Sequence, residues 1–140
     1  MSLRDNSSAN YTGNSFRING NTGTVYSYTD LTGTGSSAGS SRLSNFSEVY
    51  ALAGTAATAT ANTFGNTELY IPNYTSATNK PTSAYGVSEN NATASYILAN
   101  AGLVRITSAI TSIEIIPVYA GGGFNFVSGS SFFLYGIKNS

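Results

Sequence analysis

Short apolar runs recur along the chain about every ten residues, and residues typical of turns separate them. The run at 15–19 alternates apolar and polar residues, which places Phe16 and Ile18 on one face of a strand. The run at 24–31 carries large side chains on both faces, so we expect both faces to be contacted. No helical pattern with caps extends beyond a turn or two. The pattern therefore predicts an all-β domain.

Further runs predict the remaining strands of the domain. Asn90 and Asn91 stand between two of these runs and tolerate left-handed turn geometry, which predicts a hairpin. The run at 112–118 is nearly continuous in Ile, a pattern typical of a central strand. The run at 131–137 predicts a strand at the C-terminus. In order, the further predicted strands are 48–52, 67–71, 84–89, 93–98, 103–107, 112–118 and 131–137.

The segments between the runs have compositions typical of turns and loops. Gly, Ser, Thr and Ala make up almost all of 32–41, which predicts a surface loop. The segment 73–81, which follows Pro72, predicts a connection. The alternating Ala and Thr residues of 55–62 fit either a strand of small residues or an exposed excursion. The glycines at 121–123 are expected to supply positive φ at a turn or bulge.

The composition narrows the classes of protein that this domain can belong to. The chain lacks cysteine and histidine, which removes disulfide frameworks, thiol nucleophiles, imidazole bases and the usual zinc sites. Charged residues make up 9% of the chain, with six basic and six acidic groups. The 10 Tyr and 7 Phe predict a folded chain. No apolar run is long enough to span a bilayer, and the first residues lack the apolar core of a signal peptide.

No motif in the chain predicts catalysis, and we expect no cofactor and no metal. The six carboxylates are interpreted as solvated or ion-paired surface groups rather than as a catalytic pair. A Ser–Lys dyad is disfavoured because Lys80 lies in a turn and Lys138 lies at the C-terminal end. The glycine-rich segment 33–39 does not match a dinucleotide fingerprint. Four scattered arginines and two lysines cannot form a nucleic-acid groove.

Tyrosines are the candidate contact residues of this chain. Aromatic rings stack on sugars, and neighbouring Asn and Ser side chains supply hydrogen bonds, so Tyr26, Tyr28, Tyr74 and Tyr85 are candidates for glycan contact. The alternative is that the same four rings pack against a neighbouring subunit or a covering loop, and this second interpretation is preferred. The residues alone leave both alternatives open.

An ordered set of segments covers most of the chain. These segments are FRINGNTG at 16–23, YSY at 26–28, IPNYTSATNK at 71–80, AGL at 101–103, ITSI at 110–113, FNFVSG at 124–129 and FFLYGIK at 132–138. The set resembles a module that recurs in virion proteins of tailed bacteriophages, and the closing segment at 129–138 carries most of the resemblance. The resemblance implies a structural role in the virion on a β-sandwich, without an active site.

The chain departs from this module at its N-terminus. Related modules carry a further segment before the strand that Ser2, Leu3 and Arg4 resemble. One explanation is that the sequence begins late within the module. The other is that a neighbouring subunit completes the sheet by strand addition, which requires an open edge beside Leu3.

Taken together, these observations predict one domain, 1–140, that folds as an antiparallel β-sandwich of jelly-roll type. We expect a small structural protein that is displayed in many copies on the exterior of a phage particle, as a capsid decoration or a tail or fibre component. Its expected partners are other virion proteins and copies of itself, in a trimer that assembles in the host cytoplasm. Neither nucleic-acid binding nor membrane insertion is expected. The alternative is an adhesin that recognises host surface carbohydrate, and an enzyme that degrades capsular polysaccharide is a more distant alternative.

Overall fold

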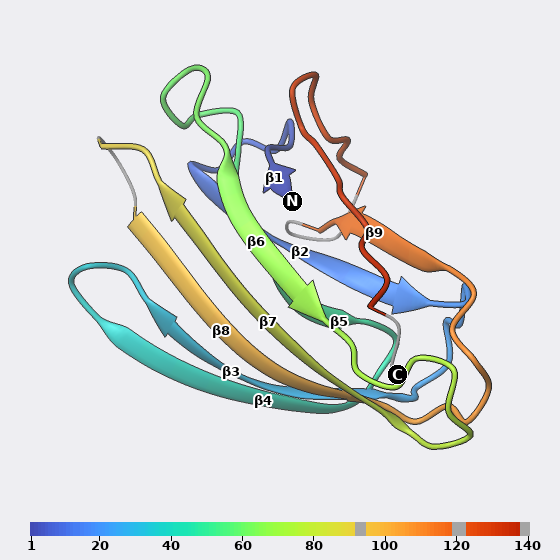
Figure 1. Ribbon diagram of the computed structural model, residues 1–140. Coiled ribbons are helices and arrows are strands. Elements are labelled where there is room, and N and C mark those ends of the chain that lie inside the picture. Colours follow the sequence, from blue (N-terminus) through green and yellow to red (C-terminus); the bar gives the residue numbers. More distant parts are fainter. Residues whose placement is uncertain (92–94, 119–122, 138–140) are drawn as a thin grey trace.

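The computed structural model describes residues 1–91, 95–118 and 123–137. Within these ranges the chain forms strands and no helix (Figure 1). The strands are β1 (Ser2–Leu3), β2 (Tyr11–Ile18), β3 (Tyr26–Gly33), β4 (Ala38–Phe46), β5 (Val49–Thr55), β6 (Gly65–Tyr70), β7 (Lys80–Glu89), β8 (Ser95–Val104) and β9 (Ile113–Pro117).

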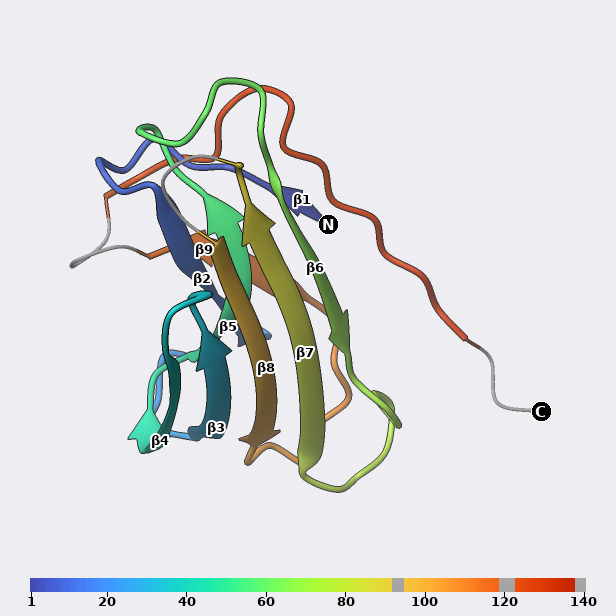
Figure 2. The same cartoon turned by 90° about the vertical axis from the view of Figure 1, so that its left-hand side faces the viewer.

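The strands form two antiparallel sheets that pack against each other. The larger sheet has the order β1-β6-β7-β8-β3-β4, and the smaller sheet has the order β5-β2-β9. Figure 2 shows the smaller sheet behind the larger one, with β5 facing the middle of it. The all-β class and the β-sandwich predicted from the sequence are therefore confirmed. The jelly-roll arrangement is not confirmed by this strand order, which places six strands in one sheet and three in the other.

The core fills the space between the two sheets. Phe16 and Ile18 of β2 are fully buried, as their shared face predicts. They pack with side chains from β3, β5 and β8, among them Tyr26, Val49 and Val104. Gly65 allows the sheets to approach closely, because a Cβ atom there would lie 2.6 Å from the Cα of Gly54 on β5. At this point the backbone of β6 lies directly against the backbone of β5.

Several sequence predictions are confirmed as strands. The segments at 48–52 and 67–71 correspond to β5 and β6, and the predicted hairpin is formed by β7 and β8. Asn91 adopts the expected left-handed conformation, with φ of 54°. Residues 92–94 of the hairpin turn and 121–122 of the glycine run lie outside the described residues. Gly123 has the positive φ that was expected of this run.

The segment 32–41 was predicted as a loop, and this prediction is wrong. Only the turn at 34–37 lies outside strands, and β4 then pairs with β3 from Ala38 to Phe46. All nine residues of β4 are exposed, so no buried side chain marks the strand in the sequence. The backbone ladder to β3 forms the strand without an apolar face.

Three further predictions are corrected near the C-terminus. The segment 103–107 is not a separate strand, because β8 ends at Val104. The predicted central strand at 112–118 is β9, which lies at the edge of the smaller sheet. The segment 131–137 is not a strand, since only Ser131 forms a β-bridge, to Ser2.

The same bridge bears on the strand-addition hypothesis. Leu3 is fully buried and pairs with Gly65 of β6. On the other side of β1, the Ser2 amide donates to the Ser131 carbonyl and the Ser131 amide donates to the Ser2 carbonyl, both at 2.9 Å. Because the chain itself occupies this edge, the open edge required beside Leu3 is absent and the hypothesis is wrong at this position.

Candidate functional site

The four candidate tyrosines occupy two different environments. Tyr26 and Tyr28 lie on the inner face of β3 and are buried in the core. The Tyr26 hydroxyl donates to the Asn21 carbonyl at 2.8 Å and accepts from the Ile18 amide at 3.1 Å. Burial raises the pKa of Tyr28 to about 12. These two rings are therefore core residues, and the prediction that they contact a glycan or a subunit is wrong.

Tyr74 and Tyr85 are exposed, with 47% and 53% of their surface accessible. Tyr74 lies in the connection between β6 and β7, and Tyr85 lies on the outer face of β7. The aromatic ring pairs among the described residues do not include Tyr74 with Tyr85. The four predicted tyrosines thus do not form one site, although the two exposed rings remain available for contacts.

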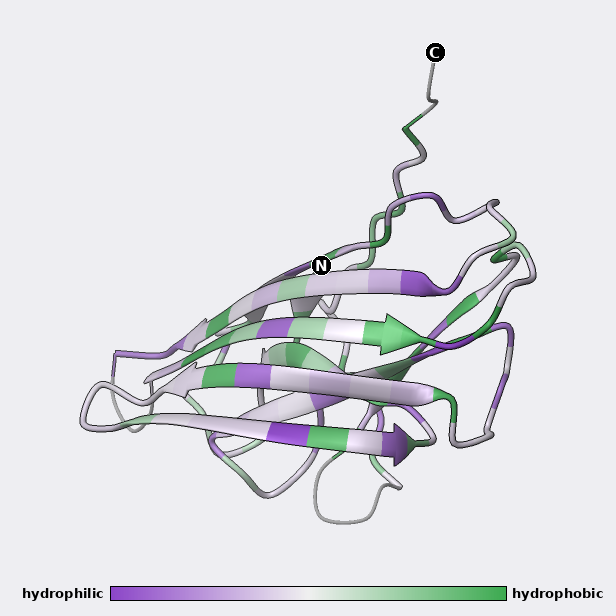
Figure 3. Cartoon of the chain, turned by 90° about the horizontal axis from the view of Figure 1, so that it is seen from below, coloured by the Kyte–Doolittle hydropathy of each residue, from purple (hydrophilic) through white to green (hydrophobic). Residues whose placement is uncertain are grey.

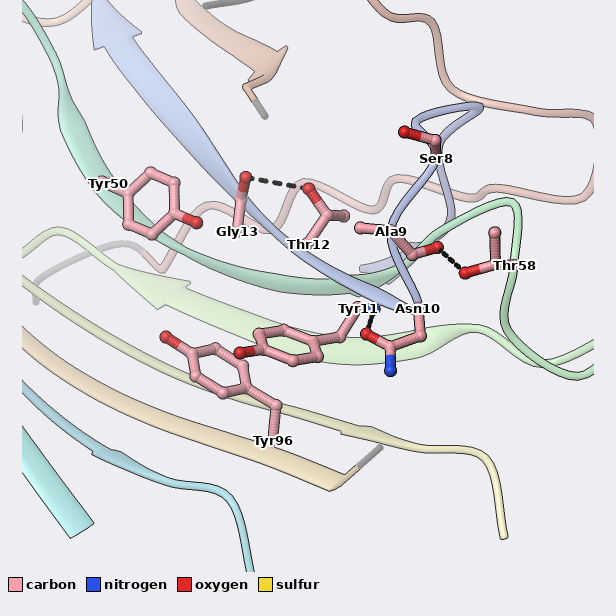
Figure 4. Close-up of a pocket in the computed structure, with 9 residues that line it drawn as sticks. All are labelled: Ser8, Ala9, Asn10, Tyr11, Thr12, Gly13, Tyr50, Thr58 and Tyr96. Carbon is pink, nitrogen blue, oxygen red and sulfur yellow. Dashed lines mark hydrogen bonds between the residues drawn. The ribbon is translucent and has the colours of Figure 1, made fainter. Parts of the chain in front are cut away.

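A cavity lined by other tyrosines opens between the two sheets at one end of the sandwich (Figure 4). Its volume is about 550 Å³. Tyr11 contributes from β2, Tyr50 from β5 and Tyr96 from β8, so both sheets supply aromatic rings. The described residues that line it are Ser8, Ala9, Asn10, Tyr11, Thr12, Gly13, Tyr50, Thr58 and Tyr96. We refer to this space as the tyrosine cavity.

The rings of the tyrosine cavity have a defined geometry. Tyr11 and Tyr96 stack with their centroids 4.6 Å apart and their planes 17° from parallel. Gly13 makes room for the Tyr50 ring, since a Cβ atom at Gly13 would lie 2.0 Å from the Tyr50 Cζ and Oη atoms. Figure 4 shows the hydroxyls of Tyr11 and Tyr96 side by side and the Tyr50 ring turned toward the same space. Sequence reasoning missed this group because its members come from three strands without a shared motif.

No charged side chain is among the described residues that line the tyrosine cavity. Burial is the largest cause that raises the pKa of Tyr50 and of Tyr96. A hydrogen bond from the Tyr50 hydroxyl to the backbone of Gly13 lowers the pKa of Tyr50, but by less than burial raises it. The phenol groups therefore stay protonated and can donate hydrogen bonds at neutral pH.

The outer face of the larger sheet is a second candidate surface. Leu31 of β3, Ile97 of β8, Tyr70 of β6 and Tyr85 of β7 all point outward from it and are exposed. Apolar residues alternate with polar ones along its strands (Figure 3). The expectation that both faces of the 24–31 segment are contacted is therefore wrong within this chain, because Leu31 is 63% exposed.

The third candidate surface is the C-terminal segment, which we define as residues 132–137. It leaves the sandwich after Ser131 and extends away from β6 (Figures 1 and 2). Phe132 makes an edge-to-face contact with Phe126 at 5.1 Å between centroids. Leu134 and Tyr135 are 86% and 81% exposed. The segment therefore presents large apolar side chains on a backbone that forms no strand.

Glu68, Glu89 and Glu114 are exposed, as the sequence predicted, whereas the other three acidic residues are not surface groups. Asp5, Asp30 and Glu48 are buried, and each has hydrogen-bond or ion-pair partners. Arg17 donates to Glu48 at 2.7 Å, and Ser41 donates to Asp30 through its hydroxyl at 2.9 Å and its amide at 3.0 Å. Within 1–91, 95–118 and 123–137, no three acidic side chains gather in a group that could hold a metal ion.

Lys80 was expected in a turn, and this expectation is wrong, because Lys80 is fully buried at the first position of β7. Its ammonium group donates to the carbonyls of Ser76 at 2.6 Å and Thr78 at 2.5 Å. The lysine therefore binds the backbone of the preceding connection, and these contacts involve no serine hydroxyl. Lys138 lies outside the described residues.

Comparisons of the chain with known proteins complete this description. Among the described residues, no helix has the length and apolar character needed to cross a membrane. No protein-family model, no curated protein and no solved structure matches the chain.

Proposed function

We propose that this chain is a structural protein of a tailed-bacteriophage particle and that it acts by assembling with copies of itself on the particle exterior. The phage assignment is supported by the ordered segments that resemble a virion module. The assembly is supported by one structural observation, which is the exposed apolar C-terminal segment. Catalysis has no part in this proposal.

The C-terminal segment has the properties of a strand that lacks a partner. Phe132, Phe133, Leu134, Tyr135 and Ile137 are large and apolar, and all five are exposed. Leaving such side chains in water forgoes about 1.5–3 kcal/mol for each one that a partner could bury. The segment also contains no charge and no proline, so its backbone is free to join a sheet. A partner surface is therefore the expected environment of this segment.

We propose that the partner surface is strand β4 of a second copy. β4 lies at the edge of the larger sheet and pairs only with β3 among the described residues. Its nine residues include one charged side chain, Arg42, and no proline, which leaves the edge without the usual protection against pairing. Leu43 and Phe46 on this strand are exposed, at 37% and 40% of their surface, and can contact apolar side chains of a partner. Addition of the C-terminal segment would extend the sheet by one strand.

Contacts of this type join different surfaces of successive copies. Such head-to-tail contacts form a closed ring when the rotation between copies closes. We propose that three copies close such a ring, which is the trimer expected from the sequence. Assembly through β4 also removes an exposed edge that would otherwise invite aggregation.

Cysteine crosslinking tests the pairing directly, because the natural chain contains no cysteine. A Leu134→Cys chain is mixed with a Ser40→Cys or Ser41→Cys chain, so that both faces of β4 are sampled. Oxidation should then link the two chains on a non-reducing gel. The matched control is Ser83→Cys, an exposed serine on β7 in the interior of the same sheet. Equal linkage to the control, or no linkage to β4, would contradict the pairing.

The virion assignment needs a separate test on particles. An antibody against the purified chain should bind the surface of intact virions in electron micrographs. Detection of the chain only in the lysate, with unlabelled particles, would refute the assignment even if the chain forms trimers.

A further inference from the structure

We propose that the tyrosine cavity binds a neutral pyranose unit of a carbohydrate. This inference does not depend on self-assembly, because the cavity is built within a single chain. It also differs from the carbohydrate interpretation of the sequence, which relied on tyrosines that the structure places elsewhere. Three properties of the cavity carry the inference: its size, its aromatic surface and its neutral hydrogen-bonding groups.

The size of the cavity is that of a ligand site. A volume of about 550 Å³ falls within the range of about 300–1,000 Å³ that is typical of small-molecule clefts. The cavity lies where β2 and β8 begin, between the two sheets, and rigid strands hold the rings on both sides. Partly enclosed hollows between packed elements are common places for small-ligand sites.

The aromatic surface matches the apolar face of a sugar ring. Tyr11 and Tyr96 are stacked on each other and are only partly buried, so the pair presents an aromatic surface toward the cavity (Figure 4). The C–H groups on one face of a pyranose pack against such a ring surface, while its hydroxyls point to the sides. Tyrosine suits this task because an apolar ring carries a polar hydroxyl at its end.

The polar groups around the rings match the sugar hydroxyls. Figure 4 shows the hydroxyls of Tyr11 and Tyr96 side by side among the residues that line the cavity. Ser8 and Thr58 add exposed side-chain hydroxyls at the rim, and the Thr58 hydroxyl also donates to the Ala9 carbonyl. Hydroxyls both donate and accept, which is the pattern that a neutral polyol requires.

The lack of basic side chains in the described lining disfavours acidic sugars and phosphates as ligands of the cavity. The described lining contributes no lysine or arginine to neutralise an anion. A neutral pyranose avoids this cost, whereas a uronic or sialic acid does not.

Saturation-transfer NMR on the full-length chain tests the inference. Tyrosine ring protons are saturated and transfer is measured to methyl glycosides of glucose, galactose and N-acetylglucosamine, with glucuronate as the charged comparison. We expect transfer to at least one neutral glycoside at a concentration of about 1 mM and little transfer to glucuronate. Maltotriose distinguishes the source of the sugar: tighter binding than the methyl glucoside assigns the site to a glycan chain, and equal binding assigns it to a single sugar unit.

Variants then locate the binding site. Tyr96→Leu keeps an apolar side chain but removes the aromatic surface, and it should weaken binding by about tenfold. Tyr85→Leu is the matched control, because Tyr85 lies on the outer face of the neighbouring strand. Gly13→Ala is a second test, since the added Cβ displaces the Tyr50 ring. An unchanged circular dichroism spectrum verifies the fold of each variant.

Three results would overturn the inference: no transfer to any neutral glycoside, equal transfer to glucuronate, or equal weakening by Tyr96→Leu and Tyr85→Leu. The test is separable from that of the proposed assembly. A chain with Leu134→Asp should still bind the glycoside, because Leu134 is not part of the cavity lining.

Discussion

Replacing Leu134 by alanine tests how much the C-terminal segment contributes to assembly. Leu134 is 86% exposed in the single chain, so nearly the whole side chain is available for burial against β4 of a second copy. The substitution removes the equivalent of three methylene groups at about 0.8 kcal/mol each, which is about 2 kcal/mol per interface. A trimer has three such interfaces, so its dissociation should become easier by about 6 kcal/mol, or roughly four orders of magnitude.

The assay is sedimentation velocity across a dilution series. The natural chain should sediment as a trimer, and Leu134→Ala should shift the transition to monomer toward much higher concentration. Unfolding of the diluted monomer by urea should change by no more than about 0.5 kcal/mol, because the side chain makes few contacts within its own chain. This second measurement separates a loss of assembly from a loss of fold.

The matched control is Leu31→Ala, which makes the same chemical change on the outer face of the larger sheet, where Leu31 is 63% exposed. Assembly through the segment and β4 predicts that this control keeps the trimer. Equal dissociation by both variants would show that copies meet through the sheet face. A natural chain that stays monomeric at every concentration would refute the proposed self-assembly.

Three further predictions concern the stability of the sandwich. Gly65→Ala should lower the free energy of unfolding in urea by about 2 kcal/mol, because the added Cβ meets backbone atoms of β5. Gly136→Ala, where the added Cβ meets no atom within 4 Å, should leave the unfolding of the diluted monomer unchanged. The free energy of unfolding should fall as the pH rises from about 10 toward 12, because Tyr28 ionises in the unfolded chain while its pKa in the folded chain is raised to about 12. Tyr28→Phe should reduce the slope of unfolding free energy against pH in alkaline unfolding curves. Glu48→Gln should lower the free energy of unfolding by about 1–2 kcal/mol, since it removes the Arg17–Glu48 ion pair at 2.7 Å and leaves Arg17 only the longer ion pair to Glu114 at 3.8 Å. An unchanged melting temperature would contradict this.

Apolar alternation in the sequence was sufficient to predict the sandwich class and most of its strands. Phe16 and Ile18 were predicted to share a face, and both are buried on that face. β4 escaped prediction because all nine of its residues are exposed and its Gly and Ser residues give no apolar alternation. The segment 132–137 was predicted as a strand from its apolar run, but a strand needs a partner as well as a suitable sequence. Its own chain supplies a bridge only at Ser131.

For the candidate tyrosines, too, the sequence predicted one part of the arrangement and the tertiary structure decided the rest. A period of two residues indicates that Tyr26 and Tyr28 share a face, but it does not indicate whether that face meets the core or the solvent. Packing against β2 and β5 buries that pair, while the outer face of β7 leaves Tyr85 in water.

The sequence by itself therefore determined the class of fold, the alternation of side chains along each strand and the scarcity of charge. Only the tertiary structure decided which faces are buried, which edges stay open and that Tyr11, Tyr50 and Tyr96 meet in one cavity. The reason is that side-chain alternation is a local property of the backbone. The pairing of strands and the stacking of sheets depend on contacts between residues that are far apart in the chain.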